Sequence, residues 1–278
     1  MYFTKDLSNS ELRPAKSFSP SIKQSVNYLD NIVVSVTPPA YTQQAQFEQK
    51  GLDVFVLEGS EVEWEIALEQ GAAIDTSLNE KFELTLSGDK ILPFVRNENK
   101  YSALYLAEVA TVYSITQITK KESFNSNIAT LTVQQDTAPK IEFIEPLLTI
   151  TEISKNAAPS INTVVEISDD YGVSDVKIVA SIAKGSGEAV KFRDQTFLFD
   201  NVSIIDNVAI HTKSWNLSEL DMEPGDELYF SVHAIDNKTP EAQKTTSPIK
   251  IIRWLEDDDA VVSAQGIVID FMPEYFKR

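Results

Sequence analysis

Apolar and polar residues alternate along much of this chain, and a period of two is the pattern of β-strands that bury one face. The clearest run covers residues 61–69, where Val62, Trp64 and Ile66 alternate with glutamates. Residues 32–36 and 81–87 repeat the alternation. Short alternating runs separated by turn residues, without a convincing amphipathic helix, predict an all-β protein built from sandwiches.

Residues 164–182, VVEISDDYGVSDVKIVASI, carry the same pattern on both sides of a short polar segment. That segment is Asp169-Asp170-Tyr171-Gly172, and a glycine in this place supplies the positive φ that many turns require. The stretch therefore predicts a β-hairpin with an acidic tip.

The strand pattern occurs twice. A polar, proline-containing stretch at 134–140 interrupts it, so we place a domain boundary near Ala138. We expect an extended lead-in at 1–30, one sandwich at 31–138, a second at 139–256 and a separate tail at 257–278. The predicted fold class is all-β, with two tandem immunoglobulin-like β-sandwich domains.

Charge and composition narrow the classes of partner. The formal net charge is −18, which disfavours nucleic acid and anionic lipid as partners. The chain has no cysteine, which excludes disulfides and thiolate metal sites. No apolar run reaches the ~18–20 residues of a membrane span, and the first twenty residues lack the apolar core of a signal peptide.

The sequence offers little for catalysis. It has two histidines, His211 and His233, and neither lies in a motif with a carboxylate partner. We expect His233 to face outward from its strand. The nucleotide-binding loops, the nucleophile elbow of hydrolases and the helical zinc motif are all missing. These observations predict a non-enzyme with no catalytic residue and no cofactor.

A calcium site is the alternative for the acidic loops. Asp169 and Asp170 stand in one predicted turn, and Asp236 and Asn237 stand in a later loop. Calcium takes six to eight oxygen ligands, which carboxylates and amides supply. However, Asp and Asn are also ordinary turn residues, and the calcium-loop pattern is missing. We therefore expect structural turns and no metal, and keep these four residues as calcium candidates.

Aromatic and acidic surfaces suggest further alternatives. Trp64 and Trp215 fall in phase with core positions and are interpreted as core anchors. Tyr101, Tyr105 and Tyr113 are the set from which a carbohydrate-binding module could build a stacking face. The glutamates of 61–69 form a stripe, which we interpret as a solvated sheet face.

Four phrases resemble a family of bacterial envelope proteins without an established activity. They are VTPPAYT at 36–42, EGSEVEW at 58–64, ISDDYGVSDVKI at 167–178 and MEPGDELYFSVHAIDN at 222–237. The ending FMPEYFKR is also similar to the segment that precedes the helical region of that family. The resemblance covers about residues 31–278.

In this family, N-terminal transmembrane helices precede tandem immunoglobulin-like domains and a long helical region. The resemblance implies a periplasmic or other extracytoplasmic part of an inner-membrane protein, with membrane attachment only through segments that this chain lacks. It also implies a non-catalytic spacer and protein-interaction scaffold, with protein partners in the cell envelope. It transfers no functional residue. The oligomeric state stays open.

Overall fold

The computed structural model describes residues 27–68, 80–88, 90–120, 122–185, 190–205 and 208–256. Within these ranges, the regular elements are strands and two single turns of 3₁₀ helix, η1 (Leu29–Asn31) and η2 (Ala40–Thr42). The predicted all-β class is confirmed. The predicted lead-in, apart from its last residues, and the predicted tail lie outside the described residues.

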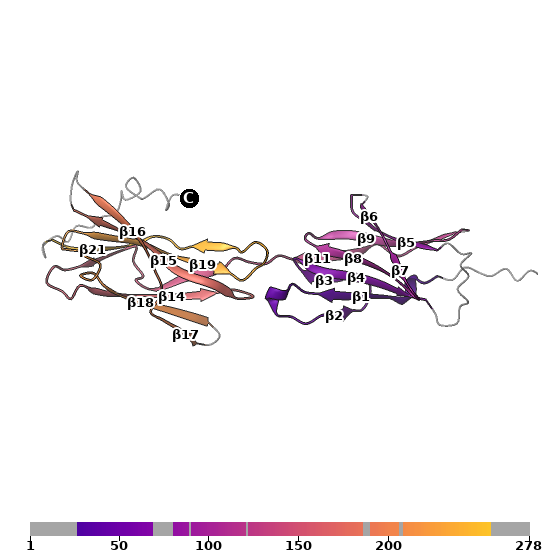
Figure 1. Cartoon of the computed structure of the whole chain (residues 1–278), viewed down its shortest axis with the longest axis horizontal. Coiled ribbons are helices and arrows are strands. Elements are labelled where there is room, and N and C mark those ends of the chain that lie inside the picture. Colours follow the sequence, from indigo (N-terminus) through magenta and orange to yellow (C-terminus); the bar gives the residue numbers. More distant parts are fainter. Residues whose placement is uncertain are drawn as a thin grey trace, which may run out of the picture. The chain divides into compact units, whose positions relative to one another are not determined.

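Strands before residue 135 form two sheets (Figure 1). The order in the first sheet is β2 (Phe47–Gln49), β1 (Ile32–Thr37), β4 (Ser60–Ala67), β8 (Lys100–Ala107) and β7 (Val95–Asn97). The order in the second is β3 (Val54–Leu57), β11 (Ala129–Gln134), β9 (Thr111–Ile118), β5 (Lys81–Leu86) and β6 (Lys90–Pro93), and β10 (Ser123–Asn125) pairs with β9.

Strands from residue 140 onward repeat this arrangement. One sheet has the order β12 (Lys140–Glu145), β14 (Ser160–Ser168), β18 (Val208–Asn216) and β17 (Asn201–Ile205). The other has the order β13 (Ile150–Ile153), β21 (Lys250–Trp254), β19 (Glu227–Asp236), β15 (Val173–Lys184) and β16 (Lys191–Phe197), and β20 (Lys244–Thr246) pairs with β19.

The strand order identifies both halves as immunoglobulin-like. The sequence β12-β14-β18-β17 has the chain order of the A-B-E-D sheet, and β21-β19-β15 has that of the G-F-C sheet. In each half the first strand of the second sheet pairs parallel with the last strand, β3 with β11 and β13 with β21. The predicted class of tandem immunoglobulin-like sandwiches is therefore confirmed by topology.

Period-two alternation buries the residues that it predicts. In β4 every second residue is buried, so Val62, Trp64 and Ile66 are inside and the glutamates between them are not. Trp64 donates its indole N–H to the hydroxyl of Tyr113 at 2.9 Å, and Trp215 donates to Thr163 at 2.8 Å. Both tryptophans are core residues, as predicted, and each buried N–H has a partner.

The hairpin predicted at 164–182 is wrong. β14 and β15 lie in different sheets, so the turn between them crosses from one sheet to the other. Alternation says which face of a strand is buried but does not select the strand that pairs with it. The expected positive φ of Gly172 is confirmed at 123°.

A second difference concerns residues 202–210, VSIIDNVAI, whose mostly apolar sequence taken by itself predicts one strand. They contribute instead to two antiparallel strands, with Ile205 of β17 opposite Val208 of β18. The apolar residues on both sides hide the reversal, because the connection is too short to show as a polar gap in the pattern.

Contacts between Cα atoms group the chain differently from the sheets. One compact unit comprises Met1–Val33, Trp64–Ala103 and Val112–Ala129, and the larger one comprises Val34–Glu63, Leu104–Thr111 and Thr130–Arg278. The domain boundaries at 31–138 and 139–256 therefore stay a prediction. The residues of the site below all belong to the larger unit.

Candidate functional site

The loop after β19 is organised by one buried carboxylate. Asp236, the last residue of β19, is 1% exposed. Its Oδ1 accepts hydrogen bonds from the backbone N–H groups of Lys238 at 3.1 Å and Gln243 at 2.8 Å. Its own N–H donates to the Gln243 carbonyl at 3.1 Å. A single side-chain oxygen thus holds both arms of the loop.

The turn after β14 is built in a similar way. Asp169 Oδ1 accepts from the N–H groups of Tyr171 at 3.0 Å and Gly172 at 2.7 Å, which is an Asx turn. Asn237 joins this turn to the loop after β19. Its N–H donates to the Gly172 carbonyl at 3.1 Å, and its Nδ2 donates to the Tyr171 carbonyl at 2.8 Å. In β15, Val173 lies opposite Asp236, so the sheet register fixes the two loops side by side.

Each of these three side chains keeps one buried oxygen without a hydrogen-bond partner. They are Asp169 Oδ2, Asp236 Oδ2 and Asn237 Oδ1. Among the described residues, no other buried carboxylate or amide oxygen lacks a hydrogen-bond partner. Asp226 provides the contrast. It is also buried, but one of its oxygens accepts from Gly185 N–H at 3.0 Å and the other from Glu223 N–H at 2.9 Å. A buried carboxylate in this fold can be satisfied by backbone alone, and Asp236 is not.

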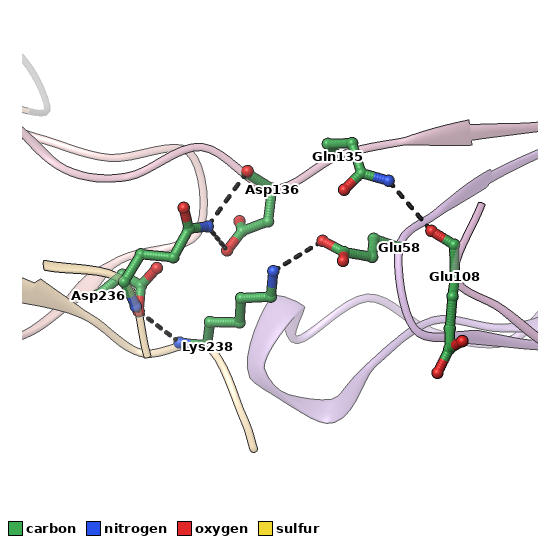
Figure 2. Close-up of polar contacts among 7 residues, drawn as sticks. Glu58, Glu108, Gln135, Asp136, Asp236 and Lys238 are labelled. Atoms are coloured by element: carbon green, nitrogen blue, oxygen red, sulfur yellow. Dashed lines mark hydrogen bonds and ion pairs between the residues drawn. The ribbon is translucent and has the colours of Figure 1, made fainter. Parts of the chain in front are cut away.

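The neighbouring lysine side chains form ion pairs with other carboxylates. Lys238 places its ammonium 2.7 Å from a carboxylate oxygen of Glu58, and Asp136 accepts from the Gln243 amide at 3.2 Å and 3.1 Å (Figure 2). Lys177 pairs with Asp175 at 3.3 Å. Among the described residues, Asp236 Oδ2 therefore has no hydrogen-bond partner, although the charge of Lys238 also acts on Asp236.

Burial and mutual repulsion perturb the protonation of this cluster. Burial raises the pKa of Asp169, and the charges of Asp170 and Asp236 add to the increase against the two backbone hydrogen bonds. Burial also raises the pKa of Asp136. The phenol of Tyr41 has its pKa raised to about 12 by burial and by the nearby carboxylates. The cluster is therefore an electronegative environment, in which positive charge would be stabilised.

The structure brings together three of the four calcium candidates. Asp169, Asp236 and Asn237 lie in contacting loops, whereas the Asp170 side chain is exposed at the edge of the turn. In the described part of the chain, no three His, Cys, Asp or Glu side chains converge in the manner of a metal cluster. The expectation of no metal stays a prediction.

A groove of about 550 Å³ opens beside the same turn. One wall is the start of β15, and the other is formed by β17, β18 and the segment before β17. The lining residues are Ile167, Ser168, Asp169, Gly172, Val173, Ser174, Asp175, Val176, Leu198, Phe199, Val202, Ala209 and His211. The sequence pattern does not reveal this groove, because its walls come from two sheets and residues 202–210 resemble a single strand.

The histidines do not form a catalytic site with one another. His211 packs edge-on against Phe199, and burial lowers its pKa. His233 lies on the outward face of β19, as expected, because the flanking residues Val232 and Ala234 are the ones in the core, but it is only 9% exposed. It lies opposite Lys177 and Thr246, which share its face of the sheet. Burial, and then the neighbouring lysine charges, lower the pKa of His233 to about 4, so it is neutral at pH 7.

The three tyrosines and the glutamate stripe are explained by burial and by ordinary surface ion pairing. Tyr101 and Tyr113 are buried, so the three tyrosines of the carbohydrate alternative do not form an exposed stacking face. Of the glutamate stripe, Glu65 pairs with Lys100 at 2.6 Å, as on an ordinary sheet surface. Glu69 lies outside the described residues. No helix among the described residues is long and apolar enough to cross a membrane.

No protein-family model and no curated protein matches this chain. Solved structures do match it. A titin A168–A169 structure aligns at 12% identity with a TM-score of 0.25, covering 72% of this chain and 93% of its own. The titin tandem immunoglobulin domains A164–A165 align at 9% and 0.22, covering 74% and 93%. A chicken T-cell receptor structure aligns at 10% and 0.23, covering 74% and 99%. These TM-scores are too low to support a fold assignment, so the assignment rests on the strand order.

Proposed function

We propose that this chain is a non-catalytic scaffold that binds an extended segment of a partner protein along β17. The observation that carries the proposal is an open sheet edge with apolar side chains beside a groove. Tandem immunoglobulin-like sandwiches serve interaction and spacer roles through their edges and loops, and the described residues show no catalytic constellation.

The edge itself is suited to strand addition. Among the described strands, β17 ends its sheet and pairs with β18 alone, so its outer backbone groups face away from the sheet. Val202 is 59% exposed and Ile204 is 76% exposed. Exposed apolar edge strands favour pairing with a further strand, and proteins that do not use them usually protect them with charge or proline. β17 carries neither at its described exposed positions, Asn201 to Ile204.

The groove determines what kind of segment fits. Val202 lies opposite His211, and both line the groove. If a strand were added to β17, its side chains on the same face as Val202 would lie close to the groove. Its lining is mixed: apolar side chains, among them the strongly exposed Leu198, form one wall, and the carboxylates of Asp169 and Asp175 stand on the other. With a net charge of −18 on the whole chain, the complementary ligand is an extended segment with apolar residues flanked by lysine or arginine.

The location of this activity follows from the family resemblance. The phrases around residues 36–42, 167–178 and 222–237 suggest an extracytoplasmic part of a membrane-anchored bacterial envelope protein. In this proposal the partners are envelope proteins, and the sandwiches also act as a spacer between the membrane and the bound partner.

A peptide array drawn from exported proteins tests the proposal. The chain, an Ile204→Lys variant and an Ile91→Lys variant would be compared. Ile91 is the matched control, because it is 53% exposed on β6, which also ends its sheet. We expect basic, apolar, extended peptides to bind the parent chain and the Ile91→Lys variant, and to lose at least tenfold in affinity with Ile204→Lys.

Backbone amide shifts identify the binding site directly. Bound peptide should shift the resonances of β17 and β18 more than those of β6. Equal binding by all three proteins, or shifts confined to other strands, would remove β17 as the docking edge. Site-specific photo-crosslinking at position 204 in cells should recover an exported protein, and recovery of cytoplasmic proteins alone would contradict the location.

A further inference from the structure

The unpartnered oxygens in the loops after β14 and β19 point to a ligand that the proposed function does not require. We propose that Asp169, Asp236 and Asn237 bind one calcium ion. The first two would contribute Oδ2 and the third would contribute Oδ1.

The chemistry of the donors selects the ion. All three atoms are oxygens, two of them from carboxylates, and hard oxygen donors suit calcium or magnesium. Calcium accepts irregular geometry with protein oxygens supplemented by water, whereas magnesium requires a near-ideal octahedron. Two carboxylates and one amide are fewer ligands than in tight sites. The affinity expected is therefore that of extracellular modules, with a Kd of about 10⁻⁴–10⁻³ M.

The side-chain positions are set before the ion arrives. Oδ1 of Asp169 and Oδ1 of Asp236 are each held by two backbone N–H groups, and Nδ2 of Asn237 is held by the Tyr171 carbonyl. These bonds fix the rotation of each terminal group and leave the second oxygen for a ligand. Because ordering the ligands costs conformational entropy, a pre-ordered set binds more tightly than free loops would.

Burial makes an uncompensated arrangement unfavourable. Asp236 is 1% exposed, and burying a carboxylate oxygen without a partner costs more than burying one that accepts a hydrogen bond. The Asp226 carboxylate, with a backbone donor on each oxygen, shows that the same sandwich can supply such partners. A divalent cation would compensate Asp169 and Asp236 together. Asp169 and Gly172 line the groove, so one of the three proposed ligand residues borders it.

The test is a calcium titration of the chelator-treated full chain. At about 10 mM calcium we expect the melting temperature to rise by roughly 3–10 °C, which is what mass action on a site of this affinity gives. Terbium should bind as well, and its luminescence should be excited through Tyr171, the residue next but one to Asp169. Excess calcium should reverse that signal.

Three variants locate the site. Asp169→Asn and Asp236→Asn keep the Oδ1 acceptor and remove one charge, and each should weaken calcium binding at least tenfold. Asp175→Asn is the matched control, because Asp175 lies near the same turn, has an exposed side chain and carries the same charge. It should retain binding. If Asp236→Asn does not fold, Asp169→Asn together with terbium luminescence still decides the question.

Two results would overturn the site. One is no change in melting temperature or luminescence at about 10 mM ion. The other is an equal response of the parent chain, Asp169→Asn and Asp175→Asn, which would mean that divalent ions screen the net charge generally. Sodium chloride of the same ionic strength measures that screening.

Discussion

The hairpins after β9 and β19 occupy the same place in their sheets and are closed in the same way, but with different chemistry. After β9, Thr119 N–H donates to the Glu122 carbonyl at 3.0 Å, and Thr119 Oγ1 accepts from Glu122 N–H at 3.1 Å. After β19, Asp236 and Gln243 exchange the same pair of bonds at 3.1 Å and 2.8 Å.

The difference lies in what the side chain has left over. The Thr119 hydroxyl also donates, at 2.7 Å to the Glu122 carbonyl, so its hydrogen is used within the loop. A carboxylate has no hydrogen and two acceptor oxygens, and at Asp236 one of them is buried without a donor. A hydroxyl can therefore close such a hairpin alone, whereas a buried carboxylate needs a further partner. At Asp236 that further partner would be a ligand bound to Oδ2.

Removing the brace after β19 should have the largest effect. In metal-free buffer, Asp236→Ala leaves the N–H groups of Lys238 and Gln243 without their acceptor, and we expect a loss of about 2–4 kcal/mol in the free energy of unfolding. Thr119→Val removes the equivalent acceptor after β9 at a more exposed site, and should cost about 0.5–1 kcal/mol. Urea denaturation of both variants measures the difference. Equal losses would show that the two braces are equivalent.

Alanine substitutions at one turn glycine in each sandwich should differ by a smaller amount in their cost to the free energy of unfolding. A Cβ at Gly172 would lie 3.2 Å from Asn237 Nδ2, while one at Gly88 meets nothing within 4 Å. Both residues have positive φ, so alanine is strained at each by about 1 kcal/mol. Gly172→Ala must also displace Asn237, and we expect it to cost roughly 1 kcal/mol more. Thermal denaturation of the two variants compares them, and a cost at Gly88 as large as at Gly172 would mean that Asn237 adjusts freely.

The sequence was sufficient to predict buried faces but not strand partners. Val62, Trp64 and Ile66 are inside because alternation is a local property of a strand. The pairing of β15 with β19, rather than with β14, depends on residues 44 (Ala183 to Glu227) to 63 (Val173 to Asp236) positions apart. His233 shows the same limit. It is buried although it lies on the face opposite the core, where Lys177 of β15 and Thr246 of β20 flank it.

The candidate site was predicted in its residues and not in its geometry. Asp169, Asp236 and Asn237 could be named because acidic and amide residues concentrate in turns. Their meeting required the β15–β19 register, which places Val173 opposite Asp236. The β17 edge was missed, since the only mark of the reversal in residues 202–210 is the polar pair Asp206-Asn207 within an otherwise mostly apolar run.

The smallest effect that we expect is the pH dependence of folding stability that Asp169 contributes, and its sign can be tested. Burial raises the pKa of Asp169 above its unfolded value of about 3.9. The folded state therefore holds this proton more tightly than the unfolded state does. In metal-free buffer, the contribution of Asp169 to stability rises as pH falls through the raised folded pKa and is complete below the unfolded pKa.

Bound calcium should reverse this sign. The ion holds the carboxylate deprotonated, so protons compete with it and acidification over the same window removes stability. Other carboxylates titrate in this range, and the quantity to compare is therefore the unfolding free energy of the parent chain minus that of Asp169→Asn, from pH 7 to pH 4. This difference should increase toward low pH without calcium and decrease with it. If this difference changes with pH in the same direction in both conditions, calcium does not bind at Asp169. The turn would then have only a structural role, like the hairpin after β9.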